Sequence, residues 1–256
     1  MADRRIIAIA NQKGGVGKTT TAINLGAALA ELGLPVTIID LDPQGNASTG
    51  LGIDAADRDP SSYDLLTADA DWSSARRPTS LDHLSIVPAS SDLASAELDI
   101  AQRARRTQLL ADALSDATGI VLIDCPPALG LLTINAMVAA DSLIVPLQAE
   151  FYALEGLSQL MLTIREVRAS ANPSLRIEGV LLTMSDARNN LSQQVEADAR
   201  KTLGPLVFQT VVPRNVRVSE SPSHALPVIH YDPSSKGSAA YRALAQEVTA
   251  KGAARG

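Results

Sequence analysis

The stretch NQKGGVGKTT, residues 11–20, combines glycines, two lysines and two threonines in a way that decides the fold. It follows an apolar run over residues 6–10 and precedes a helical pattern over residues 19–32. A strand, a glycine-rich turn and a helix in this order direct successive backbone N–H groups and the positive end of the helix dipole at one point. Such a point attracts phosphate, so the stretch predicts a nucleotide-binding loop.

The end of this loop has the spacing of a triphosphate-binding motif. Lys18 is expected to reach the β- and γ-phosphates of a nucleoside triphosphate, and Thr19 to offer its hydroxyl to Mg²⁺. The strict pattern G-x-x-x-x-G-K-[ST] is not met, because its first glycine falls on Gln12. The glycines come later, and the expected nucleotide-binding residues of the loop are Gly14, Gly15, Val16, Gly17, Lys18, Thr19 and Thr20.

Acidic residues end two further apolar runs. VTIIDLDPQGN, residues 36–46, ends its run with Asp40 and Asp42, and GIVLIDCPP, residues 119–127, ends with Asp124. Because alternate residues of a strand share a side, Asp40 and Asp42 are both expected to face the phosphates. We expect Asp42 to position the attacking water, and Asp40 and Asp124 to support Mg²⁺. The two prolines after Asp124, followed by Gly130, predict a switch loop that responds to the γ-phosphate.

The rest of the chain alternates short apolar runs with helical patterns, which predicts an α/β fold. The sheet should be mostly parallel and twisted, with helices on both faces and ligands at the carboxyl ends of the strands. We expect one domain over residues 1–256. Residues 54–80 are the least regular part, with one short helix near 63–66. Strands are expected over residues 6–10, 36–39, 84–87, 120–123, 142–145, 177–183 and 207–212, and helices over 19–32, 107–117, 154–169, 191–203 and 238–251.

Composition excludes several classes of protein. Apolar residues make up 46% of the 256 residues and aromatic residues 3%, which favours a core of Ala, Val, Ile and Leu. No run has the length of a membrane-spanning helix and no signal pattern begins the chain, so we expect a cytoplasmic protein. The single cysteine, Cys125, excludes an internal disulfide. Residues 1–150 carry a net charge of −9 and residues 151–256 one of +3, so a basic face is conceivable only in the last third.

KGGVGKTT resembles the deviant Walker A motif of the ParA/MinD-type ATPases. The stretches DLDPQGNAS, DCPPALGLLTINA, YALEGLSQL, LLTMSDARNNL, VPRNVRVSESPSH and YDPSSKG look like the chromosomal ParA (Soj) branch, so the resemblance covers nearly the whole chain. It implies a P-loop ATPase that forms a sandwich homodimer when ATP is bound. Lys13 would cross the interface to the partner's phosphates and act as a further catalytic and nucleotide-binding residue, and Gly14 would lie where the two backbones crowd together.

The resemblance also implies a base pocket and a DNA surface. In VPRN, Pro213 would pack on the adenine and Asn215 would hydrogen-bond its edge. Arg188 in DARNNL and Arg217 in NVRVSE would contact double-stranded DNA without reading its sequence, which places the protein on the nucleoid. Lys236 in YDPSSKG is a weaker candidate, because relatives often carry a further arginine there. A ParB-like centromere-binding protein would stimulate hydrolysis and release the DNA.

Other partners of this fold agree less well with the sequence. The last helical pattern has mainly Ala on its apolar side, with Leu244 and Val248 as its larger aliphatic residues, so a membrane anchor of the MinD type is not expected. One cysteine cannot supply the paired ligands of a nitrogenase-type iron–sulfur cluster. A positioning ATPase for a plasmid, a chemoreceptor array or another cargo would use the same catalytic residues and stays open as the alternative. A metabolic ATP-dependent ligase would need a substrate pocket, for which we find no motif.

Overall fold

An eight-stranded sheet forms the centre of the computed structural model, which describes residues 4–150 and 153–253. The strand order is β3-β4-β2-β5-β1-β6-β7-β8, and every pairing is parallel except that of β3 with β4. The strands are β1 (Arg5–Ile9), β2 (Val36–Asp40), β3 (Arg77–Pro78), β4 (Leu84–Val87), β5 (Ile120–Asp124), β6 (Ser142–Gln148), β7 (Arg176–Ser185) and β8 (Val207–Pro213).

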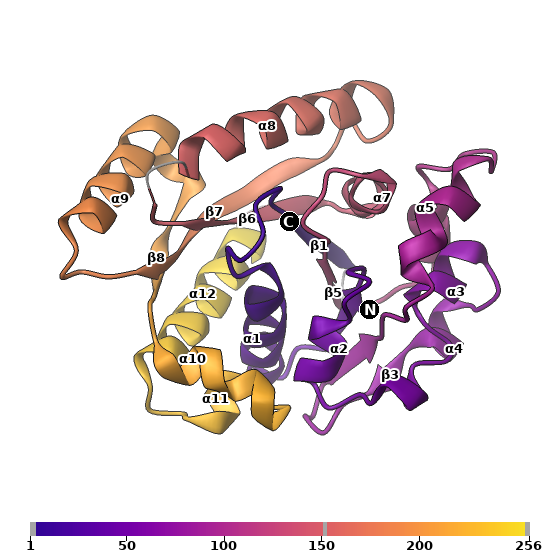
Figure 1. Ribbon diagram of the computed structural model, residues 1–256, viewed down its shortest axis with the longest axis horizontal. Coiled ribbons are helices and arrows are strands. Elements are labelled where there is room, and N and C mark those ends of the chain that lie inside the picture. The colour runs from indigo at the N-terminus through magenta and orange to yellow at the C-terminus, as the bar shows by residue number, and fades with distance from the viewer. Residues whose placement is uncertain (1–3, 151–152, 254–256) are drawn as a thin grey trace.

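Helices cover both faces of this sheet (Figure 1). One face carries α1 and α12, and the other carries α5, α6, α7 and α8. The helices are α1 (Lys18–Glu31), α2 (Asn46–Gly50), α3 (Ser62–Thr67), α4 (Trp72–Ala75), α5 (Leu93–Ala101), α6 (Leu109–Ala113), α7 (Leu131–Ala139), α8 (Ala153–Ser170), α9 (Asn190–Leu203), α10 (Val216–Glu220), α11 (Val228–Tyr231) and α12 (Lys236–Ala253).

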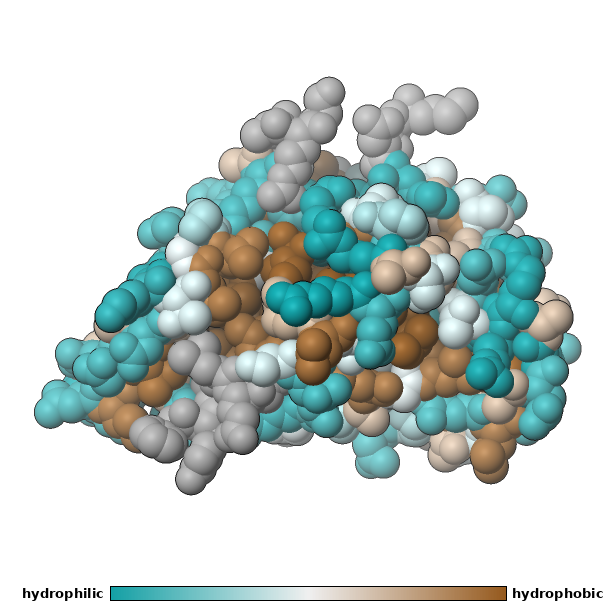
Figure 2. Space-filling model, turned by 90° about the horizontal axis from the view of Figure 1, so that it is seen from above, coloured by the Kyte–Doolittle hydropathy of each residue, from teal (hydrophilic) through white to brown (hydrophobic). Residues whose placement is uncertain are grey.

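The alternation of side chains along β1 explains why two helical layers are needed. Ile6 and Ala8 belong to the core that packs against α5–α8, whereas Ile7 and Ile9 belong to the core beneath α1 and α12. All four are buried, as expected for a central parallel strand. Seen from above (Figure 2), apolar residues lie near the middle of the molecule and hydrophilic residues along its flanks.

The predicted fold class is confirmed, and every predicted strand is present with ends shifted by a few residues. The sequence does not predict β3, because two residues are too short to show alternation. The helix expected over residues 107–117 is only the short α6. The sequence also gives no prediction for α5 or α7. Six of the nine residues of α7 are buried. A helix that is buried on most sides lacks the periodic apolar and polar pattern of a surface helix, so the sequence does not reveal it.

Asn172 closes the carboxyl-terminal end of α7. This side chain is 8% exposed, and its Nδ2 donates to the carbonyls of Met137, Val138 and Ala140 at 3.0, 3.1 and 2.8 Å. The last carbonyls of a helix have no partner within the helix, so a buried helix end needs such a donor. Asn172 therefore fixes the distal end of a helix whose first turn follows Asp124.

We predict that Asn172→Ala lowers the free energy of unfolding by roughly 2–3 kcal/mol, because it leaves buried carbonyls without a donor. Urea unfolding followed by circular dichroism measures this change. Ser174→Ala is the matched control, since it removes the 2.8 Å hydrogen bond from the Ser174 hydroxyl to Asn172 Oδ1 but leaves the carbonyls satisfied. The control should change stability by no more than about 1 kcal/mol. Equal effects of the two substitutions would contradict this role.

Candidate active site

The carboxyl ends of β1, β2 and β5 meet at one point. In the parallel registers, Asp124 of β5 lies beside Ile9 of β1 on one side and beside Asp40 of β2 on the other. The loop between β1 and α1, residues 10–17, leaves β1 at the same edge. The sheet topology therefore brings the predicted phosphate loop and two of the predicted carboxylates together, as expected for an α/β ligand site.

Two glycines near the end of the phosphate loop, residues 10–17, have left-handed backbone conformations. Gly15 has φ = 74° and Gly17 has φ = 87°, a region that residues with a side chain rarely adopt. Gly17 is the N-cap residue of α1, and no side chain caps this end or places an acidic group in the first turn. The amides at the start of α1 are thus left for a ligand, and their partial positive charge suits an anion.

Lys18 lies inside the site. Its side chain is buried, with a relative exposure of 6%, and its Nζ donates to the carbonyl of Lys13 at 3.2 Å. Burial lowers the pKa of Lys18, while the negative charges of Asp124 and Asp42 act in the opposite direction. The Lys18 ammonium donates to one carbonyl and lies near the carboxylates of Asp124 and Asp42. It is therefore well placed to neutralise phosphate oxygens.

Asp124 is a buried carboxylate that lacks a hydrogen-bond donor among the described residues. Both of its oxygens are inaccessible and meet no donor at normal hydrogen-bond geometry among the described residues. Burial, and then the charge of Asp40, raise the pKa of Asp124 well above its usual range, and the nearby Thr19 hydroxyl offsets this only in part. Such a group favours a nearby cation.

The Asp124 carboxylate and the Thr19 hydroxyl are a donor set that suits Mg²⁺ better than a metal ion held by protein ligands alone. No group of three His, Cys, Asp or Glu side chains within residues 4–150 and 153–253 converges on a common metal position. Mg²⁺ usually keeps several waters and binds through one or two carboxylates together with substrate phosphates. Asp124 and the Thr19 hydroxyl would hold the ion beside bound phosphate, where it would neutralise charge.

Asp40 has a different environment from Asp124. Its Oδ2 accepts hydrogen bonds from the backbone amide and hydroxyl of Ser48 at 2.9 and 2.7 Å, and its Oδ1 accepts one from the Asp42 amide at 3.2 Å. Burial raises the pKa of Asp40 to about 6, although these hydrogen bonds oppose the shift. The carboxylate therefore anchors α2, and its expected role toward Mg²⁺ stays a prediction.

The position of Asp42 does not follow from strand alternation. Strand β2 ends at Asp40, so Asp42 lies in the following turn, where its Oδ1 accepts a hydrogen bond from the Gln44 amide at 3.0 Å. Asp42 nevertheless stays close enough to Lys18 to raise the pKa of that lysine. It is mostly buried at 8% exposure and belongs to the same site.

Lys13 points away from the site that Lys18 occupies. Its Nζ forms an ion pair with Glu150 Oε2 at 3.0 Å, and its side chain is 43% exposed. The loop beneath it is fixed by Asn11, whose Oδ1 accepts from the Lys13 amide at 3.0 Å and whose Nδ2 donates to the Pro146 carbonyl at 2.7 Å. Lys13 and Lys18 thus have opposite environments, because Lys18 is buried and Lys13 is exposed to solvent.

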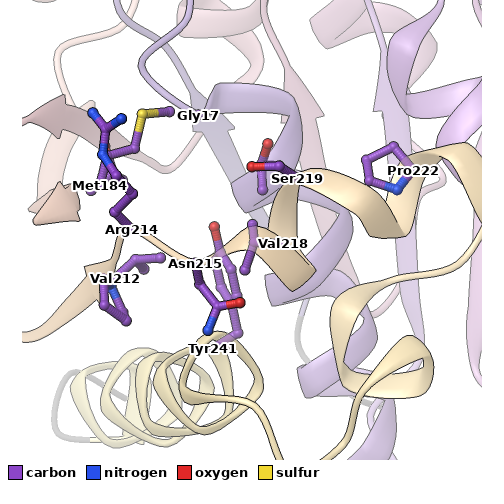
Figure 3. A pocket seen from close by; sticks show the side chains of 12 residues that line it. Gly17, Met184, Val212, Arg214, Asn215, Val218, Ser219, Pro222 and Tyr241 are labelled. Atoms are coloured by element: carbon purple, nitrogen blue, oxygen red, sulfur yellow. The ribbon is translucent and has the colours of Figure 1, made fainter.

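A cavity of about 230 Å³ opens beside the phosphate loop (Figure 3). Its lining includes Gly17 and Thr20 from the phosphate-loop side of the chain, together with Pro213 and Asn215, whose expected role toward adenine stays a prediction. The Asn215 side chain lies between Val212 and Val218, and its Oδ1 caps α10 by accepting from the Arg217 amide at 2.9 Å. A mostly apolar slot with an amide group is suited to a planar base.

The candidate DNA-binding residues lie on the surface, and both arginines are paired with acidic neighbours. Arg188, 91% exposed, precedes α9 and pairs with Asp186 at 3.1 Å. Arg217 on α10 pairs with Glu220 at 3.0 Å and with Asp232 at 3.3 Å. Lys236 is exposed at the start of α12. Arg188 follows β7 and Arg217 follows β8, and these two strands are parallel neighbours whose ends Ser185 and Pro213 are paired in register.

Three supporting residues of the site are absent from the sequence-based prediction. Thr183 on β7 donates to the Val16 carbonyl at 2.9 Å, and Ser48 and Asn11 make the contacts described above. Asn11 adjoins the glycine-rich motif, so its position after a strand is a usable signal. Thr183 has no such signal, because the residue that it contacts lies 167 positions away in the sequence.

The fold, the phosphate loop, the buried carboxylates and the adjacent cavity define a P-loop ATPase of the deviant Walker A class. The chain is 56% identical over 252 residues to the chromosome partitioning protein ParA of Caulobacter vibrioides, covering 96% of this chain and 94% of that protein. It is 51% identical over 251 residues to the sporulation initiation inhibitor protein Soj of Bacillus subtilis, covering 97% and 99%. The chain belongs to the ParA/Soj family of chromosome-partitioning ATPases.

Solved structures and a family model agree with this assignment. A family model described as an AAA domain matches residues 4–177. Cobyrinic acid a,c-diamide synthase from Mycobacterium smegmatis with bound ADP and magnesium superposes with a TM-score of 0.83 at 38% identity, covering 96% of this chain and 93% of that one. The septum site-determining protein MinD from Pyrococcus horikoshii, complexed with Mg-ADP, has a TM-score of 0.78 at 28% identity, with 96% of each chain covered.

The predicted family, enzyme class and cofactors are confirmed: the protein is an ATP hydrolase that uses ATP and Mg²⁺. The roles assigned to individual residues stay predictions. Along the described part of the chain, no helix combines the length and the apolar character that crossing a bilayer requires.

We predict that Asp124→Asn stabilises the nucleotide-free protein at pH 8 by about 1–3 kcal/mol, because it removes an unpaired buried charge, while lowering Mg²⁺-dependent hydrolysis by at least about 100-fold. The pKa of Asp124 is higher in the folded chain than in the unfolded chain, so its ionisation destabilises the fold above the unfolded-chain pKa of about 4. The stabilising effect of asparagine should therefore be small near pH 4 and grow as the pH rises. Chemical unfolding at several pH values measures it.

The control for this experiment is Asp116→Asn, which removes one exposed carboxylate from the segment before β5. It should change the free energy of unfolding by less than about 0.5 kcal/mol and leave hydrolysis intact. An Asp124→Asn protein that is less stable than the parent at pH 8 would show that this carboxylate is satisfied in solution.

Proposed function

We propose that ATP binding converts this chromosome-partitioning ATPase into a homodimer that holds double-stranded DNA without sequence preference. A ParB-like partner then stimulates hydrolysis, which separates the dimer and releases the DNA. The observation that carries this proposal is the placement of Lys13, which is exposed on a loop whose own phosphate site is already served by Lys18. Relatives that are named chromosome partitioning proteins support a role in partitioning.

Lys13 has the properties of a cation supplied to a second protomer. Its ammonium lies in solvent with a solvent-exposed acidic partner, Glu150, and such an ion pair contributes little free energy. It can therefore exchange Glu150 for the more highly charged phosphates of a facing protomer. Phosphoryl transfer depends mainly on positioning and charge neutralisation, so a cation that arrives with the partner makes hydrolysis depend on assembly.

The DNA proposal rests on exposed cations in the last third of the chain. Arg188 and Arg217 each have an acidic neighbour within 3.3 Å, so one protomer offers only partly neutralised charges. Two copies on one dimer would double the number of phosphate contacts, and the second set would bind at a high effective concentration. DNA affinity would then follow the ATP-dependent dimer and fall steeply with salt.

The alternative cargo, a plasmid, a chemoreceptor array or another assembly, needs no change in the catalytic residues. Two relatives, 56% and 49% identical to this chain, carry the name chromosome partitioning protein ParA, which favours the chromosome. A ParB-like gene beside this one, with centromere repeats nearby, would separate these uses.

We predict that Lys13→Ala keeps ATP affinity within about threefold of the parent but abolishes ATP-dependent dimerisation, because Lys18 still serves the protein's own site. Analytical ultracentrifugation with a slowly hydrolysed ATP analogue measures assembly. Lys201→Ala, at an exposed lysine in the last turn of α9, is the matched control and should dimerise as the parent does. Normal assembly of Lys13→Ala would refute the role of this lysine across the interface.

We further predict that Arg188→Glu and Arg217→Glu each leave dimerisation intact but weaken DNA binding at least about tenfold at low salt, since each reverses a charge at a phosphate contact. Fluorescence anisotropy with a DNA duplex at two salt concentrations measures this. Arg105→Glu is the control, because Arg105 is also exposed and paired, with Asp112 at 3.0 Å, but belongs to the segment between α5 and α6. Unchanged DNA affinity in both variants would remove these residues from the DNA surface.

A further inference from the structure

Helix α7 begins directly after the loop that follows Asp124, and it lacks a cap of its own. Its N-cap residue is Gly130, which has no side chain to offer, and its first turn contains no acidic residue. The missing acceptor comes instead from α5, where Oε1 of Glu97 accepts a hydrogen bond from the Leu132 amide at 3.2 Å. Leu132 is the second residue of α7, so Glu97 occupies the position of an N-cap acceptor.

The glycine at position 130 makes room for this contact. A Cβ built on Gly130 would overlap Oε1 of Glu97 and would lie 2.9 Å from its Cδ. The φ of Gly130 is −83°, which any residue adopts, so the glycine leaves room for the Glu97 carboxylate, and a Cβ here would displace the end of that side chain. Glu97 and Gly130 therefore form one fitted pair between two helices that are far apart in the sequence.

The first turn of α7 is in turn joined to the loop over residues 125–130. The Thr133 hydroxyl donates to the Ala128 carbonyl at 2.6 Å, and the Cys125 amide donates to the Ile9 carbonyl at 3.2 Å. On the other side of this loop, Pro127 Cβ lies within 4.0 Å of the position that a Cβ of Gly14 would take. Contacts thus run from α5 through the first turn of α7 to the loop over residues 125–130, in which Pro127 faces Gly14 of the phosphate loop.

We propose that Glu97 is a positioning residue for ATP hydrolysis. By capping α7 from the neighbouring helix, it fixes the first turn of α7 and so limits the conformations of residues 125–130, which adjoin both Asp124 and the phosphate loop. Glu97 acts through α7 and contacts none of the predicted nucleotide-binding residues. The inference concerns hydrolysis, which the family performs, and it does not depend on the proposals about the dimer or DNA.

The expected consequence is a loss of turnover with little loss of ATP binding. Without Glu97 the phosphate loop and Lys18 keep their contacts, so the affinity for ATP should change less than about twofold. The loop over residues 125–130 would spend less time in the arrangement that supports hydrolysis, so kcat should fall about 3- to 10-fold. A purely structural role would lower the melting temperature without separating kcat from KM.

The test compares Glu97→Ala with Glu97→Gln in the full chain, with ATP hydrolysis followed at saturating Mg²⁺, in the presence and absence of a DNA duplex. The glutamine side chain keeps a carbonyl oxygen that accepts from the Leu132 amide, so Glu97→Gln should retain at least about half of the parental kcat. Asp99→Ala is the control on α5: its carboxylate accepts from the hydroxyls of Tyr63 and Ser95 and not from α7. It should leave kcat unchanged.

A double-mutant cycle tests the fitted pair directly. Gly130→Ala should displace the end of Glu97 and lower kcat to about the same extent as Glu97→Ala. In the Glu97→Ala background, the added methyl group enters vacated space, so Gly130→Ala should cause less than about a twofold further change. Independent, multiplicative effects would overturn the proposal.

Amide hydrogen exchange in the nucleotide-free protein supplies a readout that requires no hydrolysis. The Leu132 amide should exchange at least about tenfold faster in Glu97→Ala than in the parent, with the parental rate largely restored in Glu97→Gln. Unchanged exchange and unchanged kcat in Glu97→Ala would overturn the proposal, as would a loss of kcat that Glu97→Gln shares in full. Because exchange is measured without ATP, DNA or a partner, failure of the proposed partitioning cycle leaves this result interpretable.

Discussion

The burial of Asp124 without a hydrogen-bond donor among the described residues is the constraint on which the site depends. A central strand of a parallel sheet can satisfy its backbone, but it offers no donor to a carboxylate at its carboxyl end. The charge of Asp40 next to it adds repulsion and raises the pKa of Asp124 further. The folded chain therefore carries an electrostatic cost at this point, and a cation beside bound phosphate relieves it. Ligand binding and local stability are coupled through one side chain.

The ionised carboxylate of Asp124 is costly to bury, so the segments around it must be held in place before the ligand binds. Ser48 holds Asp40 and thereby the start of α2, Thr183 holds the Val16 carbonyl, and Glu97 caps α7. Each contact joins a part of the site to an element that is distant in the sequence or follows in the chain. Such preorganisation spares the site from reorganising during the reaction, which is the main source of electrostatic catalysis. The supporting residues are thus as much a part of the function as the motif.

Local sequence patterns predict the strands, the phosphate loop and Asp124 because each depends on residues that are neighbours in the chain. They fail where tertiary contact decides. Helix α7 is buried on most sides and has no amphipathic period, and the Glu97–Leu132 contact joins residues 35 positions apart. Asp42 belongs to the predicted site, but a turn, not strand alternation, places its side chain.

The two lysines of the phosphate loop differ in solvent exposure, and this difference suits them to different tasks. Lys18 is desolvated and fixed, so it costs free energy until phosphate arrives and then contributes strongly to binding. Lys13 is solvated, and its contact with Glu150 is exchangeable, so it costs the isolated chain little. Under the proposed dimer, its contribution appears only when a second protomer brings phosphate to it. Nucleotide binding and association would then share one coupling free energy, and each would strengthen the other by the same factor.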